Sequence, residues 1–319
     1  MTMILALVAH HVVIHASDRR TTLTRRGQRS AVYSPIENKS AIFICRDAVG
    51  AIGYTGAAYI GTQPTDEWIA NQITGALKTD KRPQGFVISF GRNGLNRKKL
   101  TALLFQLKQA MDALPTSVRS VGLTVQFSGF RIRRNRCFRF YAEIGLAAGG
   151  GMISSTMRMP RSPLENGLIG QVGDCKDAKD TLHTVMKHAE AVGTQEIEAL
   201  RLAAVRTIRE RASEVATVGA DIMTITIPHP SVSREIVWQF EPATEHLGAI
   251  VGRARQDVFE AIYSPWILTP GSMMAPTIGT SALDVSCGDY IIRCGNRPAK
   301  RANGVVFASS SQRRISPPR

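Results

Sequence analysis

The apolar N-terminal run restricts the fold of this chain more than any other stretch. Residues 4–16 are an almost unbroken series of Val, Ile, Leu and Ala, with three polar members, His10, His11 and His15. Such runs are typical of strands that are buried on both faces. A tight turn at the two adjacent histidines predicts a hairpin that folds residues 12–14 back along residues 4–6. The returning strand would carry Asp18 close to Thr2.

Thr2 carries a hydroxyl and, once the initiator Met1 is removed, a free α-amine. Aminopeptidases remove an initiator Met when a small residue follows it. A threonine hydroxyl alone is a poor nucleophile, but an α-amine that titrates near neutral pH can accept its proton. Asp18 and Arg20 could orient that amine and adjust its pKa. Thr2 is therefore a candidate nucleophile that holds its own base.

The segment from Thr2 to Thr21 resembles the start of a mature proteasome β subunit, an N-terminal-nucleophile (Ntn) hydrolase. In that family a Thr opens the first strand, a hairpin follows, and an Ala-Asp-x-Arg-x-Thr-like segment ends the second strand. The resemblance implies that Thr2 is nucleophile and base, and that Asp18 is its charge partner. A plain buried hairpin that ends in an Asp-Arg turn, with Thr2 an ordinary second residue, fits the same letters.

Residues 39–58 extend the resemblance. The family places a lysine beside its nucleophile, which implies that role for Lys39 if the following strand carries a short insertion or bulge. A gapless count back from Gly56 puts Ile42 in that position instead, and Lys39 is then a solvated residue at a strand entrance. Backbone N–H groups at a Gly-rich bend form the oxyanion hole of the family, which implies that task for Gly56. A strand-to-helix turn explains the same glycine.

Residues 211–227 carry the last block of resemblance. They are similar to the family's helix end, its Arg-Asp-x-x-Ser-Gly-Gly-like loop and the strand after it. In the family that Asp and Ser help to position the amine of the nucleophile. Residue by residue, Glu214 replaces the Asp, Thr217 replaces the Ser and Gly219 is retained. The alternative is a helix C-terminus followed by a loop.

The order of the expected elements favours an α+β fold, because strand pairs and helix pairs follow one another in blocks. The resemblance implies a four-layer αββα Ntn-hydrolase sandwich of two antiparallel sheets between helix layers, with a C-terminal extension. We expect the proteasome-like domain over residues 1–240, an extension packed on it over 241–308 and a disordered basic tail over 309–319.

Local signals predict further elements. Helical spacing and capping residues predict helices that begin at Thr65 as an N-cap or cover 95–114, 176–191, 194–216 and 249–262. Strand patterns cover 85–89, 118–130, 136–144, 234–240, 288–294 and 304–308. The polar segment 19–38 predicts an exposed loop, and the glycines and proline of 161–174 predict a turn-rich connection.

The charge balance suggests a second function. The 319 residues include 40 Lys or Arg and 25 Asp or Glu, a formal net charge of +15, which favours attraction to polyanions. Residues 131–139 are rich in arginine and are flanked by aromatic residues, a mixture typical of nucleic-acid platforms. A hairpin with arginines on its solvent face explains the same letters. Nucleic acid therefore stays open as a partner.

Other classes receive less support. No apolar run is long enough to span a bilayer, and the apolar start lacks the features of a signal peptide, so we expect a cytoplasmic protein. The five cysteines are scattered, so we expect neither disulfides nor a metal, and no cofactor. A Ser/His/Asp hydrolase would need a Gly-x-Ser-x-Gly motif, which the sequence lacks.

The leading hypothesis is a proteasome-like threonine-type peptidase that cleaves amide bonds with Thr2 after Met1 is removed. The resemblance also implies self-assembly into a homo-oligomer, as a ring or a stacked assembly. The alternative is a catalytically inactive Ntn-fold subunit for assembly or binding, with nucleic acid held on its basic surface.

Overall fold

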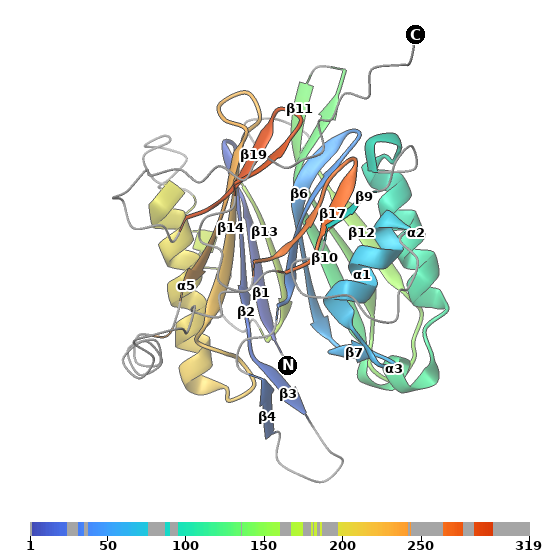
Figure 1. Cartoon of the computed structure of the whole chain (residues 1–319). Coiled ribbons are helices and arrows are strands. Elements are labelled where there is room, and N and C mark those ends of the chain that lie inside the picture. The colour runs from blue at the N-terminus through green and yellow to red at the C-terminus, as the bar shows by residue number, and fades with distance from the viewer. Residues whose placement is uncertain are drawn as a thin grey trace, which may run out of the picture.

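The computed structural model shows a mixed α+β fold with two large sheets (Figure 1). It describes residues 2–23, 31–34, 38–75, 87–89, 95–134, 136–159, 167–174, 180, 182–183, 186, 197–241, 243, 264–276 and 284–295.

The first sheet has seven strands in the order β13-β1-β2-β14-β15-β19-β18. Their bounds are β1 Met3–Val8, β2 Val12–Asp18, β13 Leu168–Gly173, β14 Ile222–Pro228, β15 Glu235–Glu241, β18 Val285–Cys287 and β19 Tyr290–Cys294. The β1–β2 pair is the expected hairpin, in which Ala6 lies opposite His15. Every residue of both strands is buried, because each strand is covered on both faces.

The second sheet has eight strands in the order β12-β11-β10-β6-β5-β16-β17-β9. Their bounds are β5 Ser40–Cys45, β6 Ala48–Gly56, β9 Val87–Ser89, β10 Leu123–Arg133, β11 Arg136–Leu146, β12 Ser154–Arg158, β16 Trp266–Leu268 and β17 Ser272–Met274. The described pairs of the two large sheets that form before β16 are all antiparallel, as expected for the first 240 residues. The two parallel pairs, β16 with β5 and β19 with β15, are made by strands of the C-terminal region.

Two short hairpins and five helices complete the described elements. The hairpins pair β3 Thr21–Leu23 with β4 Ala31–Ser34, and β7 Tyr59–Ile60 with β8 Gln63–Pro64. The helices are α1 Thr65–Thr74, the 3-10 helix η2 Leu95–Arg97, α2 Leu100–Asp112, α3 Thr116–Val121 and α5 Ile197–Glu214.

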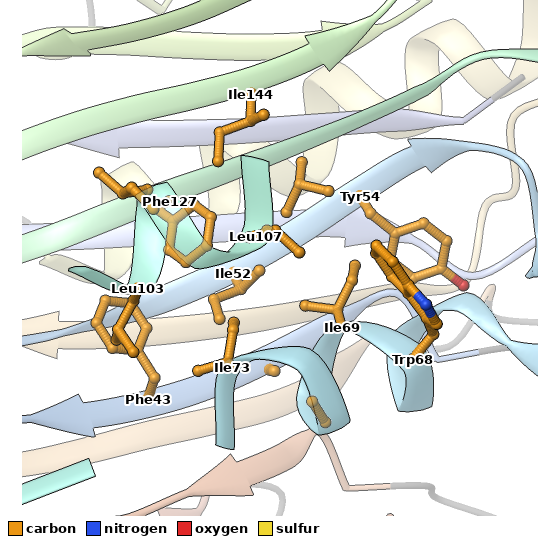
Figure 2. Close-up of a cluster of buried hydrophobic side chains, with 14 of the residues drawn as sticks. Phe43, Ile52, Tyr54, Trp68, Ile69, Ile73, Leu103, Leu107, Phe127 and Ile144 are labelled. Carbon is orange, nitrogen blue, oxygen red and sulfur yellow. The ribbon is translucent and has the colours of Figure 1, made fainter. Parts of the chain in front are cut away.

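Apolar side chains join the two sheets and attach the helices to them. Ala6, Val49 and Phe130 belong to a core that both sheets share. Leu200 and Ile208 of α5 pack against the other face of the first sheet. Figure 2 shows the cluster between the second sheet and the helices α1 and α2, where Trp68, Ile69, Ile73, Leu103 and Leu107 meet Phe43, Ile52 and Phe127.

Several local expectations were wrong. Residues 19–38 include a strand pair, and Arg19 is fully buried with its guanidinium 4.9 Å from the ring centroid of Phe240. Residues 168–173 form β13, an added edge strand of the first sheet, where a turn-rich connection was expected. Thr65 is the first residue of α1 rather than its N-cap, and its hydroxyl donates to the carbonyl of Ala57. Part of the strand expected over 118–130 is the helix α3.

The C-terminal region contributes to both sheets. The strands β16 and β17 extend the second sheet, whereas β18 and β19 extend the first. The helix expected over 249–262, the strand over 304–308 and the tail over 309–319 lie outside the described residues, as does most of the helix over 176–191.

Candidate functional site

The N-terminal hairpin places Thr2 and Asp18 at the same end of the first sheet. Ile4 lies opposite Ser17 in the β1–β2 ladder, so Met3 and Asp18, the residues beyond that pair, lie at the same end of the hairpin. The backbone N–H of Met3 donates to Asp18 Oδ1 over 3.0 Å. Thr2 is 7% exposed and Asp18 is fully buried. The hairpin thus buries the carboxylate of Asp18 beside Thr2.

Lys39 joins these two residues from the other sheet. It immediately precedes β5, and its Nζ donates to Thr2 Oγ1 over 2.8 Å and to Asp18 Oδ1 over 3.2 Å. The same ammonium also donates to the backbone carbonyl of Arg20. These contacts occupy the three donors of an ammonium group. Lys39 is 3% exposed, so the alternative of a solvated lysine at a strand entrance was wrong.

The charge of Asp18 is compensated on every side. Oδ2 accepts from the backbone N–H of Gly219 over 2.9 Å and from that of Arg20 over 3.3 Å. Oδ1 accepts from Met3 and Lys39. A buried carboxylate stays ionised only with such partners, because hydrogen bonds and an opposite charge must offset the free energy of hydration that it loses on burial.

The strand β13 holds Thr2 from its other side. The backbone N–H of Asp174 donates to the carbonyl oxygen of Thr2 over 3.0 Å. Gly173 has a φ of 89°, and a Cβ at this position would lie 1.6 Å from the same carbonyl oxygen. Only glycine therefore fits here. This strand has no periodic signal in the sequence, so neither Gly173 nor Asp174 was predicted to contact Thr2.

Glu214, the last residue of α5, reaches the site indirectly. Its Oε2 accepts from Arg211 Nη1 over 2.7 Å, and the side chain is 64% exposed. Arg211 Nε in turn donates to Asp174 Oδ1 over 2.9 Å, and these two hydrogen bonds raise the pKa of Arg211. The link from Glu214 to Thr2 thus runs through Arg211 and Asp174.

The loop after α5 approaches the site more closely. Gly219 supplies an N–H to Asp18, and Arg20 Nη1 donates to the carbonyl of Ala216 over 2.9 Å. The hydroxyl of Thr217 is buried and has no hydrogen-bond partner in the part of the chain that the structure describes.

Gly56 ends β6 near the same point. Its φ is 107°, and a Cβ there would lie 2.4 Å from the carbonyl oxygen of Gly122. The N–H of Ala57 donates to that oxygen over 2.9 Å, so this N–H is already used. Thr55 Oγ1 lies 3.3 Å from the Cβ position at Gly173, which places the end of β6 beside Thr2.

A buried polar chain lies between the sheets behind Lys39. His15 Nε2 and Ser40 Oγ are 3.0 Å apart, and Ser17 Oγ lies 2.7 Å from Ser40 Oγ. Gln126 Nε2 approaches His15 Nδ1 at 3.4 Å. Burial lowers the pKa of His15 to about 3, so the ring is neutral in the folded protein at neutral pH. The sequence identified His15 only as a polar member of an apolar run.

The described residues contain no group of three or more His, Cys, Asp or Glu side chains arranged for a metal ion. Among the same residues, no helix has the length and apolar character needed to cross a bilayer.

Comparison with known proteins gives a structural similarity only. No family model and no curated protein matches the chain. One similar solved structure is Anbu (ancestral beta-subunit) from Yersinia bercovieri, with 13% identity and a TM-score of 0.46 over 72% of this chain and 84% of that one. Another is an Anbu (Gly-1) mutant from Hyphomicrobium sp. strain MC1, also with 13% identity and a TM-score of 0.46, over 80% of this chain and 94% of that one.

Proposed function

We propose that the chain is a threonine-type Ntn hydrolase that cleaves amide bonds with Thr2 once Met1 has been removed. The observation that carries the proposal is the 2.8 Å contact between Lys39 Nζ and Thr2 Oγ1, with Asp18 bound to the same ammonium. A cation beside a hydroxyl favours its deprotonated form, and this is what a weak nucleophile needs.

The proposed reaction has two halves. Thr2 Oγ1 attacks the carbonyl carbon of the amide, and the α-amine freed by Met1 removal accepts the hydroxyl proton. The amine then donates that proton to the leaving nitrogen as the C–N bond breaks, which leaves an ester on Thr2. Water, deprotonated by the same amine, hydrolyses this ester and regenerates the hydroxyl.

Other residues would orient the reacting groups. Lys39 and Asp18 hold the hydroxyl of Thr2 in place. Thr217, whose hydroxyl has no hydrogen-bond partner among the described residues, is our candidate for binding the new α-amine. Gly56, whose backbone is open to solvent at the end of β6, is our candidate for stabilising the oxyanion.

The layered arrangement supports the same proposal. Figure 1 shows α5 on one side of the paired sheets and α1 and α2 on the other. We propose that this is the αββα plan of Ntn hydrolases over residues 1–240, with 241–308 as its extension. The resemblance of the N-terminal segment to proteasome β subunits leads us to propose a homo-oligomer, and light scattering on purified protein tests its mass.

The experiment combines processing, labelling and turnover. Intact-mass spectrometry of the full chain from its native host should show loss of Met1. An electrophile selective for an N-terminal threonine should then add to Thr2 once per chain. Thr2→Ser should keep hydrolysis of a peptide library, and Thr2→Ala should abolish it, although both residues permit Met1 removal. A wild-type chain that retains Met1 would overturn the proposal.

A non-catalytic subunit is the second candidate. The observation that favours it is the position of Glu214, whose carboxylate pairs with Arg211 instead of Thr2. In this case the processed chain would lack both labelling and turnover, while its assembly would be unaffected by Thr2→Ala.

A further inference from the structure

The arginine-rich segment 131–139 divides into two structural groups. Arg131 Nε pairs with Asp47 Oδ2 at 3.0 Å, and Arg139 is 5% exposed, so both belong to the body of the sheet. Arg133, Arg134 and Arg136 lie exposed at the tip of the β10–β11 hairpin. No carboxylate among the described residues pairs with these three guanidinium groups.

The base of this hairpin is held rigidly. The carbonyl of Asp47 accepts from the N–H of Ile132 over 2.7 Å, in addition to the ion pair with Arg131. Asp47 Oδ1 also accepts from the N–H of Leu100 at the start of α2. One aspartate thus ties the hairpin to the turn between β5 and β6 and to a helix.

The strand register brings like charges together at the tip. Arg133 lies directly opposite Arg136, and Arg131 lies opposite Phe138. Opposite residues of an antiparallel pair leave the sheet on the same face, and like charges in that position repel. Arg134 at the turn has a φ of 50°, a left-handed conformation that an arginine adopts at a cost. An anion placed between the guanidinium groups would relieve the repulsion.

The three arginines share a cavity with one aromatic ring. Arg133, Arg134, Arg136 and Phe138 line a space of about 530 Å³. Guanidinium groups bind phosphate oxygens in a fork geometry, and a part-exposed aromatic ring such as that of Phe138 can stack on a nucleobase. The combination suits a ligand with both parts.

The cavity is remote from the proposed hydrolase site. The strand β10 begins at Leu123, opposite Gly56 at the Thr2 end, and finishes at Arg133. At about 3.3 Å per residue this strand spans roughly 30 Å. Figure 1 shows the N-terminus and the β10–β11 tip at opposite ends of the molecule. Changes at the tip therefore test binding without altering Thr2.

We propose that this cavity binds a nucleotide unit, with its phosphate between Arg133, Arg134 and Arg136 and its base against Phe138. A free nucleotide and a single-stranded nucleic acid share this chemistry. The proposal is independent of the hydrolase function, because no residue of the cavity touches Thr2, Asp18 or Lys39 in the described contacts.

The test is fluorescence anisotropy of a labelled oligothymidylate with the full chain at low salt, compared across variants. We expect Arg133→Ala with Arg136→Ala to weaken binding at least tenfold. The slope of log affinity against log salt should fall by roughly 1.4, since each phosphate contact to a single strand contributes about 0.7. Phe138→Ala should weaken binding of the oligomer about fivefold while leaving competition by inorganic phosphate unchanged.

A matched control removes the same charge elsewhere. Arg158 on β12 and Arg206 on α5 are exposed, and their double alanine variant should bind within twofold of wild type. The basic C-terminal residues add the same background to every variant. If adenosine monophosphate displaces the labelled oligomer at concentrations that fill one site, the ligand is a free nucleotide. If the oligomer stays bound, the ligand is a single-stranded nucleic acid. Absence of binding, or equal loss in both double variants, would overturn the proposal.

Discussion

Positive charge is buried and paired at one end of the molecule and exposed and unpaired at the other. At the Thr2 end a single ammonium, that of Lys39, is 3% exposed and bonds Thr2, Asp18 and a carbonyl. At the β10–β11 tip three guanidinium groups are exposed, and none of them pairs with a carboxylate of the described residues.

The difference follows from solvation. A buried charge persists only where hydrogen bonds and an opposite charge replace its water, so removing one partner is costly. An exposed charge keeps its water and costs little when it is unpaired. The buried, fully bonded ammonium suits a group that must hold one geometry. The exposed, unpaired guanidinium groups suit a surface that binds a ligand.

The largest expected effect is that of Asp18→Asn. This change leaves the Lys39 ammonium buried without its carboxylate and should lower the free energy of unfolding by about 3–5 kcal/mol. Urea unfolding followed by circular dichroism measures it. The double variant Asp18→Asn with Lys39→Met should recover part of the loss, since no uncompensated charge remains. An unchanged unfolding midpoint in the single variant would show that the contrast between the two ends is wrong.

The next effect concerns Gly173→Ala. The added Cβ would lie 1.6 Å from the carbonyl oxygen of Thr2, at a φ of 89°, so β13 or Thr2 must shift. We expect a loss of roughly 2–4 kcal/mol, from backbone strain and overpacking together. Gly271→Ala is the control, because nothing lies within 4 Å of its Cβ position, and it should stay within about 0.5 kcal/mol. Thermal unfolding of both variants tests the difference.

An intermediate case is the buried but neutral His15. Its pKa is about 3 in the folded chain and 6.5 as the ordinary value, so the unfolded state binds a proton first as pH falls. Stability is full above about pH 6.5 and declines toward pH 3, by at most about 1.4 kcal/mol per pH unit. His15→Gln should flatten this part of the profile. Urea midpoints measured at half-unit pH steps would decide, and parallel profiles for the two proteins would contradict the assignment.

The smallest expected effect has the opposite sign. Arg136→Ala removes the repulsion with Arg133 across the hairpin and should raise the free energy of unfolding by about 0.2–0.5 kcal/mol. Arg136→Glu should raise it further, because it converts the like pair into an opposite one. A fall in stability for both variants would mean that the tip arginines support the fold and are not reserved for a ligand.

Much of the site's frame could be predicted from the sequence. The apolar run broken by two histidines predicted the β1–β2 hairpin, and its strand pairing is confirmed. The proximity of Asp18 to Thr2 followed from that hairpin. The catalytic roles of Thr2, Asp18, Lys39, Gly56, Glu214 and Thr217 stay predictions that the proposed labelling and turnover experiments address.

Other parts could not be predicted, because they depend on contacts across the fold. The edge strand β13 has no alternating pattern of its own, and it forms because β1 offers an unpaired edge. The fold turns Glu214 toward Arg211, although the sequence match pointed it toward Thr2. The ion pair of Arg131 with Asp47, which separates Arg131 from the exposed arginines of the tip, joins residues that are distant in the sequence.

The sequence by itself determined the β1–β2 hairpin and the residue types at the N-terminal end, because apolar periodicity and turn residues act over short ranges. Only the tertiary structure decided whether Lys39 reaches Thr2 and which arginines stay exposed to solvent. Both outcomes depend on whether a long charged side chain finds an oppositely charged or hydrogen-bonding partner when it is buried. That partner comes from a part of the chain that is distant in the sequence.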